Sequence, residues 1–119
     1  MPAWEIAVRA AQARKAEDIV VLDISVLSSF TDAFVLCTGR SQRQLQAIAD
    51  AIEQELRAEG WRPMGVEGRR DAPWILMDYG DFVIHVLTPE ARKFYDIERL
   101  WRAAPRMSVA EASQTPTTA

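Results

Sequence analysis

The stretch from residue 78 to residue 101 constrains the fold more than any other, because it encodes a turn, a strand and a helix start in direct succession. Gly80 is able to take the positive φ that a tight hairpin turn requires. We therefore predict that residues 74–77 and 82–87, which flank this turn, form antiparallel strands.

The hairpin is followed at once by the signals of a short amphipathic helix. Thr88 suits the N-cap, and Pro89 suits the first helical position because its missing N–H would be unpaired there in any case. Phe94, Ile97 and Trp101 recur at helical spacing behind it. We expect these three side chains to form one packing stripe.

Three further strands are predicted upstream. Residues 19–22 and 33–38 lack the polar alternation of a half-exposed strand, which indicates burial on both faces. Residues 61–66 predict a weaker strand, placed at a sheet edge because Pro63 cannot donate a ladder hydrogen bond. Residues 67–73 are predicted to be an exposed loop.

Two helices are predicted before the hairpin. The first ends among residues 14–16, and its modest apolar stripe consists of Trp4, Val8 and Ala11. In the second, Ser41 and Gln44 form a capping box and Gly60 ends the helix. The second helix carries an apolar stripe of Leu45, Ile48, Ile52 and Leu56.

These elements predict the α/β class, with a single mixed β-sheet flanked by helices. At 119 residues the chain has room for one domain. We place that domain at residues 1–102. Large apolar residues become scarce after Trp101, so residues 103–119 are predicted to be a flexible tail.

Composition argues against several classes of protein. The longest apolar run, residues 33–37, is far shorter than the roughly 20 residues of a membrane span, and the N-terminus lacks a signal-peptide pattern. A cytoplasmic protein without a membrane partner is therefore expected. The single cysteine, Cys37, is interpreted as a buried structural thiol rather than a nucleophile. Neither a metal nor a cofactor is predicted.

The charge balance favours a protein partner over a nucleic acid. The net charge of −3 is unsuited to general phosphate binding, so no specific nucleic-acid site is expected. The basic pairs Arg69–Arg70 and Arg92–Lys93 are the local exceptions. Excess acid instead favours approach to a basic protein surface.

One enzymatic alternative is a metal-dependent nucleotidyltransferase. Asp78 and Asp81 flank the turn closely enough to share a cation, and residues 38–41 lie between a strand and a helix as a phosphate cradle would. Ordinary turn chemistry explains both features, and the two aspartates are three residues apart rather than two along one strand face. The only histidine, His85, lies within a predicted strand and is interpreted as a structural residue with satisfied hydrogen bonds.

A binding module needs large side chains on an exposed sheet face or turn, because aromatic anchors concentrate interface energy. Strand alternation places Trp74 and Leu76 on one face, with Tyr79 at the turn. Core packing explains Leu76 about as well. We predict that Trp74, beside Pro73 and the charged loop, is exposed.

Several motifs occur in unbroken order over roughly residues 5–102. They are Thr31-Asp32-Ala33-Phe34-Val35, Thr38-Gly39-Arg40-Ser41, Arg43-Gln44, Ala47-Ile48-Ala49-Asp50, Glu67-Gly68 and the segment 78–101. In this combination the sequence resembles the bacterial ribosomal silencing factor family, also called Iojap-like.

The resemblance implies a nucleotidyltransferase-like α/β fold without the catalytic residues, and action by binding. Its implied partner is the large ribosomal subunit, through the ribosomal protein numbered fourteen, where occupancy blocks joining of the small subunit and represses translation under nutrient limitation. The implied contact residues are Trp74, Leu76, Asp78 and Tyr79 on the hairpin, with Arg92 and Tyr95 on the following helix. Tyr95 as a core residue, and Arg92 as a surface charge pairing with an acid such as Asp96, are the alternatives. The weak first helix is also compatible with a homodimer, in which a second copy anchors it.

Overall fold

The computed structural model describes residues 2–68 and 71–109. Six strands and four helices lie within these residues. In chain order the elements are α1 (Ala3–Ala13), β1 (Glu17–Asp23), β2 (Ala33–Thr38), α2 (Gln42–Ala58), β3 (Gly65–Glu67), β4 (Trp74–Asp78), β5 (Phe82–Leu87), α3 (Pro89–Tyr95), α4 (Ile97–Leu100) and β6 (Arg106–Met107).

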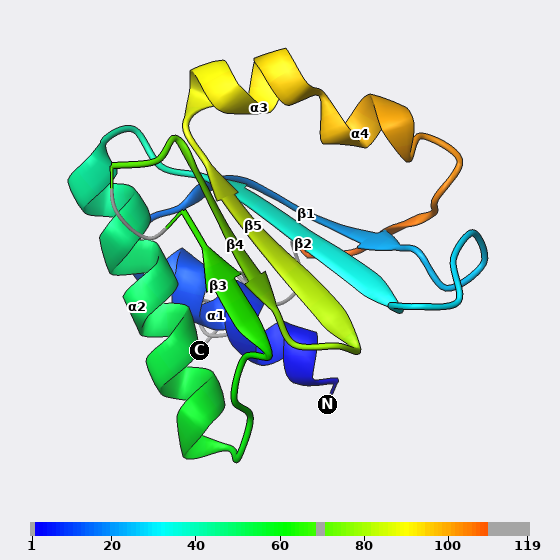
Figure 1. Ribbon diagram of the computed structural model, residues 1–119, viewed down its shortest axis with the longest axis horizontal. Coiled ribbons are helices and arrows are strands. Elements are labelled where there is room, and N and C mark those ends of the chain that lie inside the picture. Colours follow the sequence, from blue (N-terminus) through cyan, green and yellow to red (C-terminus); the bar gives the residue numbers. More distant parts are fainter. Residues whose placement is uncertain (1, 69–70, 110–119) are drawn as a thin grey trace, which may run out of the picture.

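The sheet is mixed, and its strand order is β3-β4-β5-β2-β1-β6. The central pair, β2 and β5, is parallel, whereas the other neighbouring pairs are antiparallel. The long helix α2 and helix α1 cover one face of the sheet, while α3 and α4 lie over the opposite face (Figure 1). The predicted α/β class with a mixed sheet between helices is confirmed.

The main core lies between the sheet and the pair α1 and α2. The predicted stripe of α2 is fully buried there, and it consists of Leu45, Ile48, Ile52 and Leu56. Each such side chain contributes roughly 1.5–3 kcal/mol by leaving water. Val8 and Ala11 of α1 are buried in the same cluster, so α1 is anchored within its own chain.

The two central strands are buried along their whole length, as their apolar sequences predict. Cys37 lies within β2 with no exposed surface. Burial raises the pKa of its thiol to about 12, because the low-dielectric core disfavours the thiolate. The interpretation of Cys37 as a structural thiol is confirmed.

The predicted hairpin is present. Gly80 has a φ of +84°, and the backbone N–H of Tyr79 donates to the carbonyl of Phe82 at 3.0 Å. Thr88 caps α3 as predicted, its hydroxyl accepting from the backbone N–H of Ala91 at 3.1 Å.

The single helix predicted after the hairpin is two short helices. Asp96 has a φ of +50°, a left-handed conformation that ends α3 and precedes α4. The break separates the expected stripe: Ile97 is buried and Trp101 is half-buried, but Phe94 faces solvent. The prediction of one packing stripe from helical spacing was wrong here, because Phe94 and Ile97 belong to different helices.

Two predicted boundaries differ from the structure. The strand expected over residues 61–66 is confined to Gly65–Glu67, at the sheet edge as predicted, since Pro63 and its neighbours lie outside the ladder. At the C-terminus, Arg106–Met107 pairs with β1, so the sheet extends past the boundary predicted at residue 102. Arg69, Arg70 and residues 110–119 lie outside the described residues, so flexibility of the tail stays a prediction.

Candidate functional site

The candidate site is the face of the sheet beneath α3 and α4. These helices have only seven and four residues, so they cover less of the sheet than α1 and α2 do. Trp74 and Leu76 point to this face and are half-buried, while Ile75 and Met77 point into the main core. The predicted alternation along β4 is confirmed.

Trp74 is held in one orientation by two neighbours. Its indole Nε1 donates a 3.1 Å hydrogen bond to Nδ1 of His85, and its ring centroid lies 4.6 Å from that of Tyr95. Trp74 is therefore half-buried rather than exposed as predicted, because α3 brings Tyr95 against it. A large side chain fixed at the margin of a partly covered face has the properties of an interface anchor.

His85 supports Trp74 from below. Burial lowers the pKa of its imidazole to about 4, so the ring is neutral near pH 7 and Nδ1 is free to accept. Its Nε2 has no hydrogen-bond partner among the described residues. The prediction that His85 is a structural residue with satisfied hydrogen bonds is therefore correct for Nδ1 but not for Nε2. The sequence did not identify the Trp74 indole as its hydrogen-bond partner.

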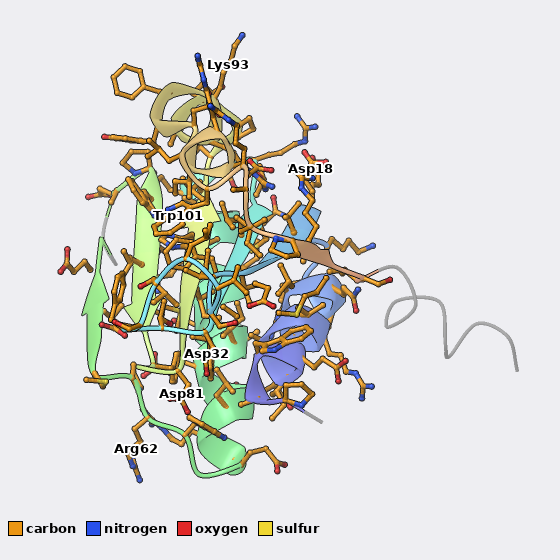
Figure 2. All side chains as sticks on the ribbon, turned by 90° about the vertical axis from the view of Figure 1, so that its right-hand side faces the viewer. Asp18, Asp32, Arg62, Asp81, Lys93 and Trp101 are labelled. Carbon is orange, nitrogen blue, oxygen red and sulfur yellow. The ribbon has the colours of Figure 1, made fainter. Side chains whose placement is uncertain are left out.

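Aromatic rings continue across this face from α3 to α4. The His85 ring makes an edge contact with Phe34 at 4.8 Å, and Phe34 makes another with Trp101 at 5.4 Å. Edge-to-face pairs of this kind add roughly 0.5–1.5 kcal/mol beyond area burial. Trp74 is therefore linked through His85 and Phe34 to Trp101, which lies beneath the helices at the top of Figure 2.

Tyr79 is placed differently from the other hairpin candidates. Its side chain is only 4% exposed and lies in the main core, where its ring stacks on Phe82 at 5.0 Å. The turn directs Tyr79 to the opposite side of the sheet from Trp74 and Leu76. The structure does not bring Tyr79 into the candidate contact face.

The two turn aspartates have separate surroundings. Asp78 Oδ1 accepts a 2.8 Å hydrogen bond from the backbone N–H of Gly80, which stabilises the turn. Asp81 is exposed, and its carbonyl oxygen accepts from the backbone N–H of Asp32. Across residues 2–68 and 71–109, no three His, Cys, Asp or Glu side chains are grouped as a metal site would require.

Arg92 belongs to an internal polar network rather than to an open surface. Its guanidinium forms two hydrogen bonds with the Glu98 carboxylate, at 3.0 and 3.1 Å, and a third with Thr38 Oγ1 at 3.0 Å. The Arg92 side chain is 11% exposed. The partner considered from sequence, Asp96, is not the one observed, because Asp96 is the left-handed residue between the helices.

This network ties α3 and α4 to the sheet. The hydrogen bond from Arg92 lowers the pKa of the Glu98 carboxyl, and Arg106 of β6 approaches the same carboxylate at 3.5 Å. The Glu98 carboxylate on α4 thus pairs with cations of both α3 and the edge strand β6. The position of Tyr95, and with it the surroundings of Trp74, depends on this anchoring.

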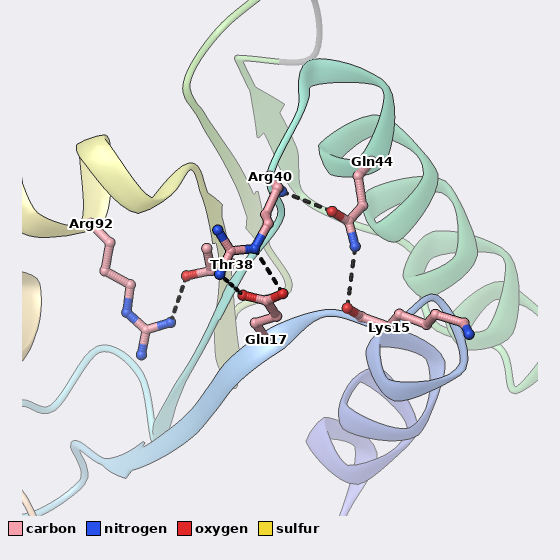
Figure 3. A network of polar contacts seen from close by, with 6 residues as sticks. All are labelled: Lys15, Glu17, Thr38, Arg40, Gln44 and Arg92. Carbon is pink, nitrogen blue, oxygen red and sulfur yellow. Dashed lines mark hydrogen bonds and ion pairs between the residues drawn. The ribbon is translucent and has the colours of Figure 1, made fainter.

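Residues 38–41, considered as a phosphate cradle only within the enzymatic alternative, form a helix cap that is joined to the turn after α1. The backbone N–H of Gln44 donates to Ser41 Oγ, and Gln44 Oε1 accepts from the backbone N–H of Arg40 rather than from that of Ser41. The amide nitrogen of Gln44 donates to the Lys15 carbonyl at 3.2 Å, as Figure 3 shows. The exposed Arg40 pairs with Glu17, so these groups are engaged within the chain.

Sequence reasoning missed two exposed apolar residues beside the site. Phe94 is 79% exposed and Leu100 is 78% exposed, on α3 and α4 respectively. The exposure of Phe94 follows from the left-handed Asp96, which ends α3 before Ile97 and Trp101 and for which the sequence carries no glycine signal.

Fold and site together define a small α/β domain whose mixed sheet carries an aromatic cluster on the face beneath α3 and α4. The family model described as "Ribosomal silencing factor during starvation" matches residues 2–119. A ribosomal silencing factor of Bacillus subtilis is 40% identical over 101 residues, which cover 85% of this chain and 86% of that protein. The chain belongs to the ribosomal silencing factor family.

Solved structures and more distant relatives agree with this assignment. A crystal structure of a Chromobacterium violaceum protein has a TM-score of 0.80 and 39% sequence identity, covering 85% of this chain and 87% of that one. A mouse relative named "Mitochondrial assembly of ribosomal large subunit protein 1" is 33% identical over 89 residues, 72% of this chain and 39% of the relative. No helix in the described part of the chain is long and apolar enough to cross a membrane.

Proposed function

We propose that this protein binds the large ribosomal subunit through the ribosomal protein numbered fourteen, and that its bound volume blocks joining of the small subunit. Translation would then be repressed in the cytoplasm when nutrients are limited. The observation that carries the proposal is the half-buried Trp74, fixed by His85 and Tyr95 on β4, where the sheet face beneath α3 and α4 is only half-buried.

The proposed contact face consists of Trp74, Leu76, Asp78 and Tyr95. Trp74 and Tyr95 supply aromatic area at a low cost in side-chain entropy, and Leu76 adds apolar surface between them and the turn. The net charge of −3 supports approach to a basic ribosomal protein. Arg92 enters the proposal as a residue that positions α3, since it is mostly buried.

Family membership supports a ribosomal partner, and the name of the mouse relative refers to the large subunit. The mechanism needs no catalytic group, because exclusion of the second subunit depends on occupancy alone. The nucleotidyltransferase alternative lacks support from geometry, since Asp78 Oδ1 is engaged by the turn and Asp81 points to solvent.

Binding to purified large subunits, followed by light scattering of subunit joining, tests the proposal. Trp74→Ala is expected to weaken binding by about 2 kcal/mol, more than tenfold, and to restore joining. Tyr95→Ser, at an exposed position, should weaken binding without loss of fold. Phe30→Ala is the matched control, because Phe30 is an exposed aromatic residue in the loop between β1 and β2.

Unchanged binding by well-folded Trp74→Ala and Tyr95→Ser proteins would reject this contact face. Absence of the wild-type protein from the large-subunit fraction in sedimentation would reject the function itself. The same material, in light scattering with and without large subunits, tests the homodimer considered from the sequence, which stays a prediction.

A further inference from the structure

An exposed apolar and basic surface lies next to the proposed contact face. We define the α3–α4 surface as Phe94, Arg99, Leu100 and Arg102, all of which are exposed. An open hollow of about 650 Å³ lies between the two helices on this side. Neither Phe94 nor Leu100 belongs to the core clusters, so folding of the chain does not explain their apolar character.

The charge of this region is opposite to that of the whole chain. Residues 89–107 contain five cations and three acids, whereas the net charge of the protein is −3. Arg92 and Arg106 both engage Glu98. Within the described residues, the side chains of Arg99 and Arg102 form no ion pair. Two cations of this surface are therefore available to an external anion.

The α3–α4 surface is continuous with the proposed contact face. The Phe94 ring stands nearly perpendicular to that of Tyr95, at an interplanar angle of 89° and a centroid distance of 5.0 Å. Tyr95 in turn contacts Trp74. When a ribosomal protein binds at Trp74, the part of the large subunit next to that protein would therefore contact Phe94 and the neighbouring cations.

We propose that the α3–α4 surface binds a single-stranded segment of ribosomal RNA in the large subunit. This inference rests on the proposed function, because docking through Trp74 is what delivers the RNA. Phe94 offers an open ring on which an unpaired base stacks, while Arg99 and Arg102, which line the same hollow, contact phosphates. An acidic protein segment would satisfy the cations equally, but the flat exposed face of Phe94 beside them favours a nucleobase.

The salt dependence of binding to purified large subunits tests the cations. Each phosphate contact with a single strand contributes about −0.7 to the slope of log affinity against log salt, so Arg99→Gln with Arg102→Gln should make the slope shallower by about 1.4. Arg43→Gln with Arg62→Gln removes the same charge from exposed sites and should leave the slope unchanged. Arg62 lies at the opposite end of the molecule from Lys93 (Figure 2).

A photo-crosslinking amino acid placed at position 94 of the full chain identifies the class of partner directly. Crosslinks to ribosomal RNA, with an affinity loss of about tenfold in Phe94→Ala, are the expected result. Crosslinks to ribosomal protein alone, or an unchanged salt slope in the Arg99 and Arg102 variant, would overturn the RNA proposal.

Failure of the underlying function has a different signature. If Trp74→Ala weakens binding but the α3–α4 variants behave like wild type, the contact face stands and the RNA site is rejected. If wild-type protein fails to bind large subunits at any salt concentration, the proposed function and the RNA site are both rejected.

Discussion

The indole N–H of Trp74 donates to Nδ1 of His85 across neighbouring strands, at 3.1 Å. The acceptor is buried and neutral near pH 7, whereas the donor stands at the margin of the open face. A core residue thus sets the orientation of a candidate anchor. Pre-orientation of this kind improves binding, because the side chain loses less rotamer freedom when the partner docks.

This hydrogen bond should be measurable as a coupling energy. We expect His85→Phe and Trp74→Phe to couple by about 1 kcal/mol in a double-mutant cycle of urea unfolding, because each removes one partner of the same bond. Single variants whose effects add without coupling would show that the bond makes no net contribution. His85→Phe should also weaken large-subunit binding, since Trp74 loses its fixed orientation.

Stability should depend on pH through His85. The pKa is about 4 in the folded chain against an ordinary 6.5, so between these values the unfolded state binds more protons and stability falls as the pH drops. From pH 7.5 to pH 5 the loss is about 2 kcal/mol. His85 is the chain's one histidine, so the difference between wild type and His85→Phe isolates the effect. Parallel curves for the two proteins over that range would contradict the burial of an uncharged imidazole.

Much of the fold follows from local signals in the sequence. The apolar runs of β2 and β5, the stripe of α2 and the Thr88 cap each determine an element without reference to distant residues. The left-handed Asp96 was not predictable in this way, because nothing local to it distinguishes a helix break from continued helix. Pairing of β6 with β1 likewise depends on long-range contact between short segments.

The candidate site was predictable only in part. Alternation along β4 identified the shared face of Trp74 and Leu76, since side-chain direction in a strand has a period of two. The burial of Tyr79 depends on how the turn directs its ring, and the pairing of Arg92 with Glu98 depends on the break at Asp96. Both are consequences of tertiary structure that residue spacing does not encode.

The ion pair between Arg92 and Glu98 should matter for stability more than for direct contact. Arg92→Met leaves the partly buried Glu98 with only the longer Arg106 contact, and we expect a loss of about 2 kcal/mol in unfolding free energy. Arg92→Met with Glu98→Leu should recover most of that loss, because no partly buried carboxylate is left without its main partner and the remaining Arg106 is exposed to solvent. If this folded double variant bound large subunits much more weakly than wild type, Arg92 would have to contact the partner itself.

The turn carboxylates should be dispensable for silencing. Asn at position 78 retains an oxygen that accepts from the Gly80 N–H, so Asp78→Asn with Asp81→Asn should keep the hairpin. Loss of the Asp78 charge from the contact face lowers affinity, but at equal occupancy of the large subunit repression of joining should be unchanged. The measurement is light scattering of subunit joining at matched occupancy. Loss of silencing in a well-folded double variant would contradict this prediction and would favour a metal-dependent reaction at this turn.

Gly68 should be the most sensitive glycine near the site. Its φ is +78°, and a Cβ there would lie 2.1 Å from the carbonyl oxygen of Trp74, so the backbone at the start of β4 would have to shift. We expect Gly68→Ala to cost at least about 2 kcal/mol in urea unfolding and to weaken large-subunit binding, because left-handed strain and the clash add. Gly65→Ala is the matched control in the same edge segment, since its added Cβ meets no atom within 4 Å. Equal stability of the two variants would show that the segment before Trp74 adjusts freely, and that Trp74 is positioned by His85 and Tyr95 alone.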